Sequence, residues 1–233
     1  MLRIFRNLRK EGILKKSKYY LWYALGEIFL VVIGILIALY INNESEQYKE
    51  KKNEIVLLNK LKEENIYNLN TLIDGVDYHK SLPKTYSDFT YYLINHKVEE
   101  LTDSLGYFLN ETMRTPTYSF SQGNLANYIN SQKNNFPEVN KEIVYLQNLE
   151  DDLYLISNKS VDIKLENYYS LLKSEIDFMT GDLYSAQVIN SVEFRNNLYL
   201  IQSVEQEFSR IFDLTVTQMQ KVDSLLIKVL KDN

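Results

Sequence analysis

Few side chains in this chain of 233 residues can hold a metal or act on a substrate, since it has two histidines and no cysteine. A di-iron site in a helical protein needs Glu-x-x-His pairs, which place a carboxylate and an imidazole one helical turn apart. Val76 stands three residues before His79, and Leu93 stands three before His96, so this site cannot form. Such scarcity also argues against other transition-metal sites, and His79 is expected to form a loop pair with Asp77.

Pairs of adjacent carboxylates are the remaining candidates for acid and base chemistry: Glu63-Glu64, Glu99-Glu100 and Asp151-Asp152. Acid and base catalysis needs carboxyl groups held beside a substrate. On segments rich in Lys and Asn, such pairs are more typical of solvated helix faces. The chain also lacks a Gly-x-Ser-x-Gly motif, a phosphate-binding Gly-rich loop and a zinc-protease pattern. We therefore predict that the protein is not an enzyme and needs no cofactor.

One apolar segment, residues 21–41, indicates where the chain lies. Every residue in it is apolar or aromatic except Gly26, Glu27 and Gly34. As a helix it spans roughly 31 Å, about the thickness of the hydrocarbon core of a bilayer. A cleaved signal peptide would have a shorter apolar part and a small-x-small cleavage site, whereas Tyr40 occupies the final position here. The sequence predicts one uncleaved, single-pass transmembrane helix, a signal-anchor that has the lipid bilayer as its first partner.

Charge on the two sides of this segment predicts its orientation. Residues 1–20 contain seven Lys and Arg against one Glu, a net charge of +6, whereas residues 42–54 contain three Lys against four Glu. Because Lys and Arg stay on the cytoplasmic side, the N-terminus is expected inside and the chain after Asn42 outside. The basic leader, residues 1–20, is either a short amphipathic helix on the inner leaflet or an unstructured topology signal.

The part of the chain beyond the leader is acidic. Subtracting +6 from the total of −5 leaves −11 for residues 21–233. Such a surface does not suit nucleic acid, whose phosphates need basic side chains, so nucleic acid is not expected as a partner. The absence of cysteine excludes disulfides and thiolate chemistry.

Three residues of the apolar segment share one face of the predicted helix. At about 100° per residue, Gly34 and Ala38 each lie within about 20° of Glu27. Small residues at positions 34 and 38 let two helices approach closely, and a carboxyl on the same stripe can hydrogen-bond across the pair. We predict that this face associates with a second copy or another membrane protein. Alternatively, Glu27 only reaches back to the lipid headgroups or the leader's lysines.

The remaining residues predict an all-α fold. Only four glycines and three prolines follow residue 41, and such sparse turn residues favour long helices over a sheet. Apolar residues recur at alternating threes and fours, as in coiled coils and helical bundles. We expect a helical stalk over residues 42–80 and an elongated antiparallel bundle over residues 81–233. The expected helix starts are Pro83, Thr102, Asn135 and Ser191, and the helix after Asn135 is expected to run to Thr180 and end at Gly181.

The segment from Thr115 to Gly123 interrupts the helical pattern with a proline, two aromatic residues and a glycine, and Asn124 follows it. Tyr118, Phe120, Gly123 and Asn124 are its candidate ligand-binding or partner-binding residues. They are either the lining of a pocket or groove, or a turn that closes the end of the bundle. The turn is the favoured interpretation, because buried aromatic residues more often belong to a core.

Two stretches of the sequence resemble a known family. The first is the leader "FRNLRKEGILKKSKYYLWYALGEI" with its continuation "GEIFLVVIGILIALYINN", and the second is "TPTYSFSQGNLANYINSQKNNF". They are similar to single-pass membrane proteins of unknown function found in Bacteroidota, especially flavobacteria. The resemblance covers residues 1–45 most closely and implies a bacterial inner-membrane protein with an external helical domain.

Two functional hypotheses follow from the sequence. The first is a non-enzymatic, membrane-anchored helical interaction or scaffold module that faces the periplasm and self-associates. The alternative is a periplasmic small-molecule-binding sensor domain that reports to a membrane partner. A buried pocket lined by Tyr and Asn would favour the sensor, and a closed aliphatic core would favour the interaction module.

Overall fold

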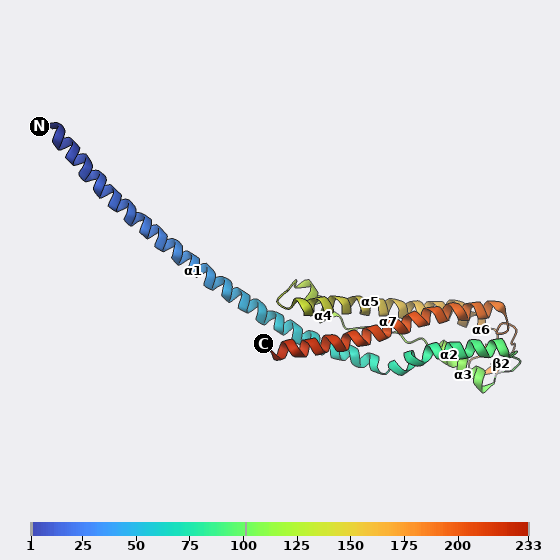
Figure 1. Cartoon of the computed structure of the whole chain (residues 1–233). Coiled ribbons are helices and arrows are strands. Elements are labelled where there is room, and N and C mark those ends of the chain that lie inside the picture. The colour runs from blue at the N-terminus through green and yellow to red at the C-terminus, as the bar shows by residue number, and fades with distance from the viewer. Residues whose placement is uncertain (1, 101, 233) are drawn as a thin grey trace. The chain divides into compact units, whose positions relative to one another are not determined.

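The computed structural model describes the backbone of residues 2–100 and 102–232 and the side chains of residues 23–100 and 102–232. The chain is almost entirely helical (Figure 1). Its elements are α1 (Leu2–Ile73), α2 (Val76–Asn95), α3 (Asp103–Met113), α4 (Gly123–Asn130), α5 (Pro137–Lys164), the π-helix η1 (Leu165–Tyr169), α6 (Ser170–Leu172), β1 (Ile176–Asp177), β2 (Asp182–Leu183) and α7 (Val192–Lys231). The predicted fold class, an N-terminal apolar helix followed by an elongated antiparallel helical bundle, is confirmed.

The chain divides into two compact units, Met1–Asn53 and Glu54–Asn233. In the first unit, every side chain of residues 23–53 is exposed. This part of α1 is the one helix among the described residues that is long and apolar enough to cross a membrane. Apolar side chains without any covering group are unfavourable in water, so this surface needs lipid or another apolar partner.

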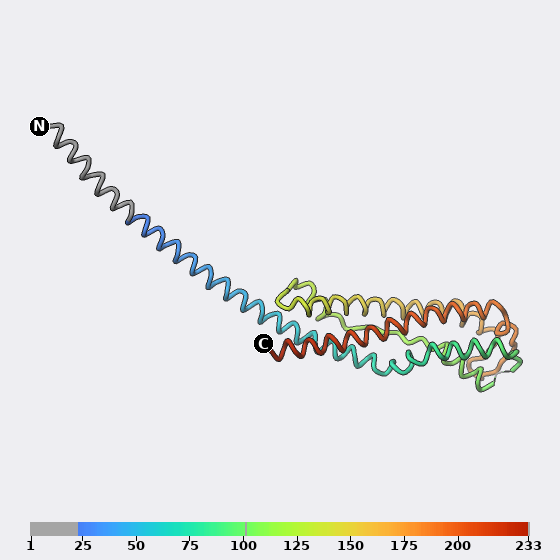
Figure 2. Tube along the Cα trace, in the orientation of Figure 1, coloured from blue at the N-terminus to red at the C-terminus, as the bar shows by residue number. Residues whose placement is uncertain are grey.

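The second unit is an antiparallel bundle of four legs (Figures 1 and 2). The first leg is α1 from Glu54 onward together with α2, and the second is α3, residues 114–122 and α4. Tyr86 bonds to Thr112 and Asn68 bonds to Ser121, so the second leg runs antiparallel to the first. Between these two bonds the first leg advances 18 residues, about 27 Å of helix, while the second advances nine. Residues 114–122 are therefore nearly fully extended.

The third leg is the continuous run of α5, η1 and α6, and the fourth is α7. Lys164 contacts Glu205 and Glu142 contacts Gln218, so these two legs are also antiparallel. The most extensive helix–helix packing is between α5 and α7, followed by that between α2 and α7. The result is an up-down-up-down bundle, in which the second leg is the thin, partly non-helical one.

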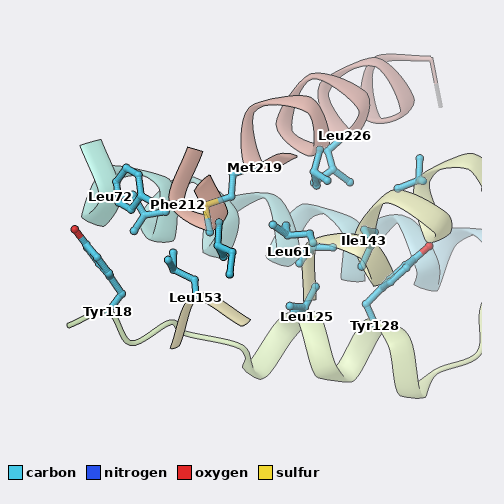
Figure 3. Close-up of a cluster of buried hydrophobic side chains, with 14 of the residues drawn as sticks. Leu61, Leu72, Tyr118, Leu125, Tyr128, Ile143, Leu153, Phe212, Met219 and Leu226 are labelled. Atoms are coloured by element: carbon cyan, nitrogen blue, oxygen red, sulfur yellow. The ribbon is translucent and has the colours of Figure 1, made fainter. Parts of the chain in front are cut away.

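Two apolar clusters fill the bundle. The proximal cluster lies toward Glu54 and includes residues from all four legs, some of which point toward one another in Figure 3: Leu61, Leu72, Leu125, Ile143, Leu153, Phe212, Met219 and Leu226. The distal cluster lies around α2, α3 and the start of α7 and includes Leu82, Tyr86, Phe89, Leu105, Tyr168, Ile189, Phe194 and Leu198. Almost all of these side chains are fully buried, which explains the apolar spacing in the sequence.

Helix starts agree with the sequence at two of four places. Thr102 caps α3 and Ser191 caps α7, each accepting a hydrogen bond from the backbone N–H three residues on. Pro83, in contrast, lies inside α2, which begins seven residues earlier, at Val76. The N-cap of α5 is Phe136 rather than Asn135, with Pro137 in the first helical position as expected.

The end of the third leg also differs from the expectation. Its helix ends at Leu172 rather than Thr180, and a small hairpin of β1 and β2 follows. Gly181 adopts φ +78° in this hairpin, a conformation that glycine adopts without strain. Residues 54–80, which we expected in a stalk, belong to the bundle, because Leu58, Leu61 and Leu72 are fully buried there.

Candidate functional site

The central residue of the predicted binding segment, Tyr118, lies inside the bundle. Its hydroxyl is 3.0 Å from Nε2 of His79, and its ring packs against Phe208 and Phe212. His79 itself is buried in α2 and stacks on Phe212, so it does not form the loop pair with Asp77 that the sequence suggested. The segment runs extended along the bundle, with Tyr118 as the one buried residue of 114–122, rather than forming a turn at the bundle's end.

The burial of Tyr118 depends on a glycine in the first leg. A Cβ atom on Gly75 would lie 2.4 Å from the hydroxyl oxygen of Tyr118 and 3.3 Å from a ring carbon of Phe212. Those two rings are buried, so neither moves away without disturbing the core. Gly75 therefore allows the helix break between α1 and α2 to sit directly against Tyr118.

Gly123 and Asn124 begin α4, and they are held by a carboxylate from the first leg. Glu64 Oε2 accepts from the backbone N–H of Asn124 at 2.9 Å, and Oε1 accepts from that of Leu125 at 2.9 Å. A carboxylate at this position satisfies N–H groups that the helix leaves free and complements the helix dipole. Phe120 packs at the edge of the proximal cluster and lines a shallow surface pocket. All four predicted segment residues thus have structural contacts.

Glu64 lies beside a second buried carboxyl group, Glu150. Asn68 donates to Glu150 Oε1 at 3.3 Å, and Gln122 donates to Oε2 at 3.1 Å. Burial raises the pKa of Glu150 to about 7, the two hydrogen bonds oppose this rise, and the negative charge of Glu64 adds to it. The sequence suggested solvated faces for Glu64, yet this residue is almost fully buried. The pair of Glu64 and Glu150 becomes apparent only in the structure, where residues 114–122 pack beside both side chains.

Halfway along the bundle, an ion pair lies in the core. Lys164 Nζ is 2.8 Å from Glu205 Oε1, and both side chains are at least 97% buried. Ser160 donates a further hydrogen bond to Glu205, and Lys164 also donates to the backbone carbonyl of Arg114. Burial lowers the pKa of Lys164, while Glu205 opposes this shift. The pair thus joins three of the four legs at one level.

Several aromatic hydroxyls surround this ion pair. Tyr86 donates to the carbonyl of Thr112, whose hydroxyl lies 2.8 Å from the hydroxyl of Tyr168. Burial raises the pKa of both tyrosines. Burial, followed by the charge of Lys164, lowers the pKa of His79 to about 4, so its imidazole is neutral at physiological pH. Together these groups form a buried polar layer between the proximal and distal clusters.

Three atoms of this layer have no hydrogen-bond partner. They are Nδ1 of His79, Oε2 of Glu205 and Oγ of Ser209. Buried polar atoms of this kind are commonly paired with internal water or another small polar molecule. Among the side chains of residues 23–100 and 102–232, no group of three or more His, Asp or Glu is placed to hold a metal ion.

An open apolar pocket of about 350 Å³ lies at the distal end of the bundle. One wall is α3, which contributes Gly106, Leu109, Asn110 and Met113, and the other is the hairpin, which contributes Ile176, Phe178 and Gly181. No pattern in the sequence indicates this pocket, because its walls meet only through tertiary packing.

The predicted membrane-association residues lie on one continuous helix. Glu27, Gly34 and Ala38 are all exposed, and a Cβ on Gly34 would meet no other atom within 4 Å. This face is therefore open to a partner in the bilayer.

Comparison of the chain with models of known protein families, with curated proteins and with solved structures finds no significant match.

Proposed function

We propose that the protein is a non-enzymatic interaction module of the bacterial inner membrane, with its N-terminus in the cytoplasm and its bundle in the periplasm. The observation that supports this most is the exposed apolar stretch of α1, which leads by a continuous helix into a bundle packed with its own side chains. A protein built this way displays surfaces on a membrane and offers no catalytic cleft among the sites described above.

Self-association through the membrane helix is part of this proposal. Glu27, Gly34 and Ala38 form a narrow face on which two helices can approach closely. A protonated Glu27 on each helix can donate a hydrogen bond to its partner, which is favourable in a medium without water. The family that the leader and membrane segment resemble gives the same location, the bacterial inner membrane.

The chain lacks cysteine, so single cysteines report helix contacts without background. We propose oxidative crosslinking of full-length Ala38→Cys and Val32→Cys in native membranes. Val32 lies about 160° from Gly34 around the helix and serves as the matched control. Disulfide-linked dimers are expected for Ala38→Cys only, and Glu27→Leu in the same chain should reduce them. Equal crosslinking at both positions, or none at either, would contradict the proposed association face.

A second candidate function, small-molecule sensing, is favoured by the three unpartnered atoms of the polar layer. A small polar molecule bound there would satisfy His79, Glu205 and Ser209 together. Native mass spectrometry of the full-length protein released from micelles tests this idea. A bound molecule of constant mass that is present in the wild type and absent in Ser209→Ala would favour sensing. A wild-type protein without any bound molecule would favour the interaction module.

A further inference from the structure

We propose that the distal pocket docks a protein segment that presents one apolar or aromatic side chain between Lys or Arg residues. This inference rests on the proposed function, because it names the kind of partner that the module binds. It concerns only the second unit, and it uses none of the membrane-face residues. The supporting observations are the pocket's lining, the exposed apolar residues beside it and the charge of its rim.

The pocket has the size and the lining of a side-chain binding site. Its volume of about 350 Å³ lies near the lower end of the range of ligand pockets, roughly 300–1,000 Å³. Glycines on both walls, Gly106 and Gly181, leave the space open, since a Cβ on either would meet nothing within 4 Å. Leu109, Ile176 and Phe178 provide the apolar floor and wall. One large side chain fits such a pocket.

Exposed apolar residues continue from the pocket onto the hairpin. Met179 is 97% exposed at the hairpin tip, and Phe178 is 45% exposed while its ring stacks on Tyr169 at a centroid distance of 5.2 Å. Tyr184, directly after β2, is 73% exposed. A flexible methionine beside exposed aromatic rings is typical of surfaces that adapt to a partner.

Carboxylates surround this apolar surface. Asp103 and Glu111 lie on α3, and Asp177 and Asp182 face each other directly across the two-residue ladder of the hairpin. Both carboxylates accept hydrogen bonds within the hairpin, Asp177 from the backbone N–H of Met179 and Asp182 from the hydroxyl of Thr180, and both add negative charge to the rim. Arg114 already pairs with Glu111, so Lys173 is the main basic residue left among residues 102–114 and 173–185. The rim is therefore complementary to a basic segment.

The same charges argue against the other occupants. An acidic rim repels the anionic headgroups of bacterial lipids, so a membrane surface is a poor fit. A second copy is disfavoured at this pocket, because a symmetric contact would place the same acidic rim against itself. A separate protein with Lys or Arg around an apolar anchor remains as the occupant with both complementary features.

Two labelled peptides with the same Trp-Leu centre test this proposal, one flanked by lysines and the other by glutamates. Their binding to full-length protein in nanodiscs of neutral lipid is measured by fluorescence anisotropy. The structure leads us to expect saturable binding of the lysine peptide, at least about tenfold tighter than that of the glutamate peptide. Raising the salt concentration should weaken the lysine peptide several-fold, because screening reduces attraction between exposed charges.

A plugged pocket supplies the decisive variant. Gly106→Trp adds a large ring at the pocket wall, where a Cβ would meet nothing within 4 Å, and it replaces a glycine in a helix, so the fold should be kept. Ser104→Trp, on the same helix but outside the pocket, is the matched control. Lysine-peptide affinity should fall about tenfold or more in Gly106→Trp and stay within about twofold in Ser104→Trp.

Equal affinity in both variants, or equal binding of the two peptides, would overturn the proposal. A dimer whose formation is lost in Gly106→Trp would instead assign the pocket to a second copy. These outcomes are separate from the test of the membrane face. If Ala38→Cys still crosslinks while no peptide binds, this inference fails and the proposed function stands.

Discussion

The hydroxyl of Tyr118 lies 3.0 Å from Nε2 of His79, directly over Gly75, where α1 gives way to α2. This contact ties the extended second leg to the first leg at the level where the helix is broken. It also places the two aromatic rings against Phe212 of the fourth leg. The middle of the bundle is therefore held by one close packing of a tyrosine, a histidine and a glycine.

Gly75→Ala should destabilise the protein although alanine fits the local backbone. Gly75 has φ −86° and ψ −13°, which any residue adopts, so the cost comes from close approaches of the new Cβ, chiefly the 2.4 Å contact with the Tyr118 hydroxyl and also the 3.3 Å contact with Phe212. We expect a loss of about 1–3 kcal/mol in the free energy of unfolding, measured by urea titration with circular dichroism. Gly106→Ala, where the added atom meets open space, should be neutral or stabilising by up to about 1 kcal/mol.

A double-mutant cycle identifies the cause. Tyr118→Phe removes the hydroxyl that the new Cβ meets and should cost less in the Gly75→Ala background than in the wild type. We expect a coupling of about 1 kcal/mol between the two positions. Additive effects would show that Gly75 is needed for some reason other than its contact with Tyr118.

Glu205→Leu should be among the most destabilising single changes in the bundle. It leaves the buried ammonium of Lys164 without its carboxylate, which in buried pairs costs about 3–5 kcal/mol. Lys164→Met combined with Glu205→Leu should recover most of this loss, because an apolar pair of similar size needs no charge compensation. Lys84→Met, which breaks the exposed pair with Asp88, is the control and should change the unfolding free energy little. A double variant as unstable as Glu205→Leu would contradict this account of the pair.

Stability should depend on pH through two buried groups with opposite effects. The pKa of Glu150 is raised to about 7, so its contribution is full below about 4.5, its value in the unfolded chain, and is lost as pH rises toward 7. The pKa of His79 is lowered to about 4, so its contribution is full above about 6.5 and is lost as pH falls toward 4.

Single variants separate these two effects. At pH 8, the free energy of unfolding of Glu150→Gln, measured by urea titration, should exceed that of the wild type by about 2 kcal/mol. This difference should shrink toward pH 5. The free energy of unfolding of His79→Gln should rise relative to that of the wild type as pH falls below 6, because the substitution removes a group that binds a proton on unfolding. An unchanged difference between Glu150→Gln and wild type from pH 5 to pH 8 would show that Glu150 does not titrate in this range.

Much of the fold follows from the sequence, because helix stripes and caps are local signals. The spacing of Phe194, Leu198 and Ile201 predicts the buried face of α7, and Ser191 predicts its start. Pro83 misled because a proline inside a helix removes a hydrogen bond and crowds the carbonyl four residues earlier, so it usually marks a helix end; the packing of α2 against α7 compensates for this cost.

Contacts between distant parts of the chain were not predictable in the same way. In the sequence, Glu64 resembles several other carboxylates on solvated helix faces. In the structure, residues 114–122 bring the start of α4 against it. Lys164 and Glu205 sit at core positions of their helices, but nothing in either stripe indicates that they pair. The distal pocket arises from the packing of α3 against a hairpin, and the hairpin itself lacks the usual turn signals.

The most direct measurement of the central claim is the side of the membrane on which the bundle lies. Met179→Cys, at the exposed hairpin tip, and Ser17→Cys, in the basic leader, introduce single cysteines into a chain that has none. Cells with a permeabilised outer membrane are treated with a maleimide that cannot cross the inner membrane. The account predicts labelling of Met179→Cys in intact cells and of Ser17→Cys only after the inner membrane is broken. Labelling of Ser17→Cys alone in intact cells, or of neither protein in the membrane fraction, would contradict it.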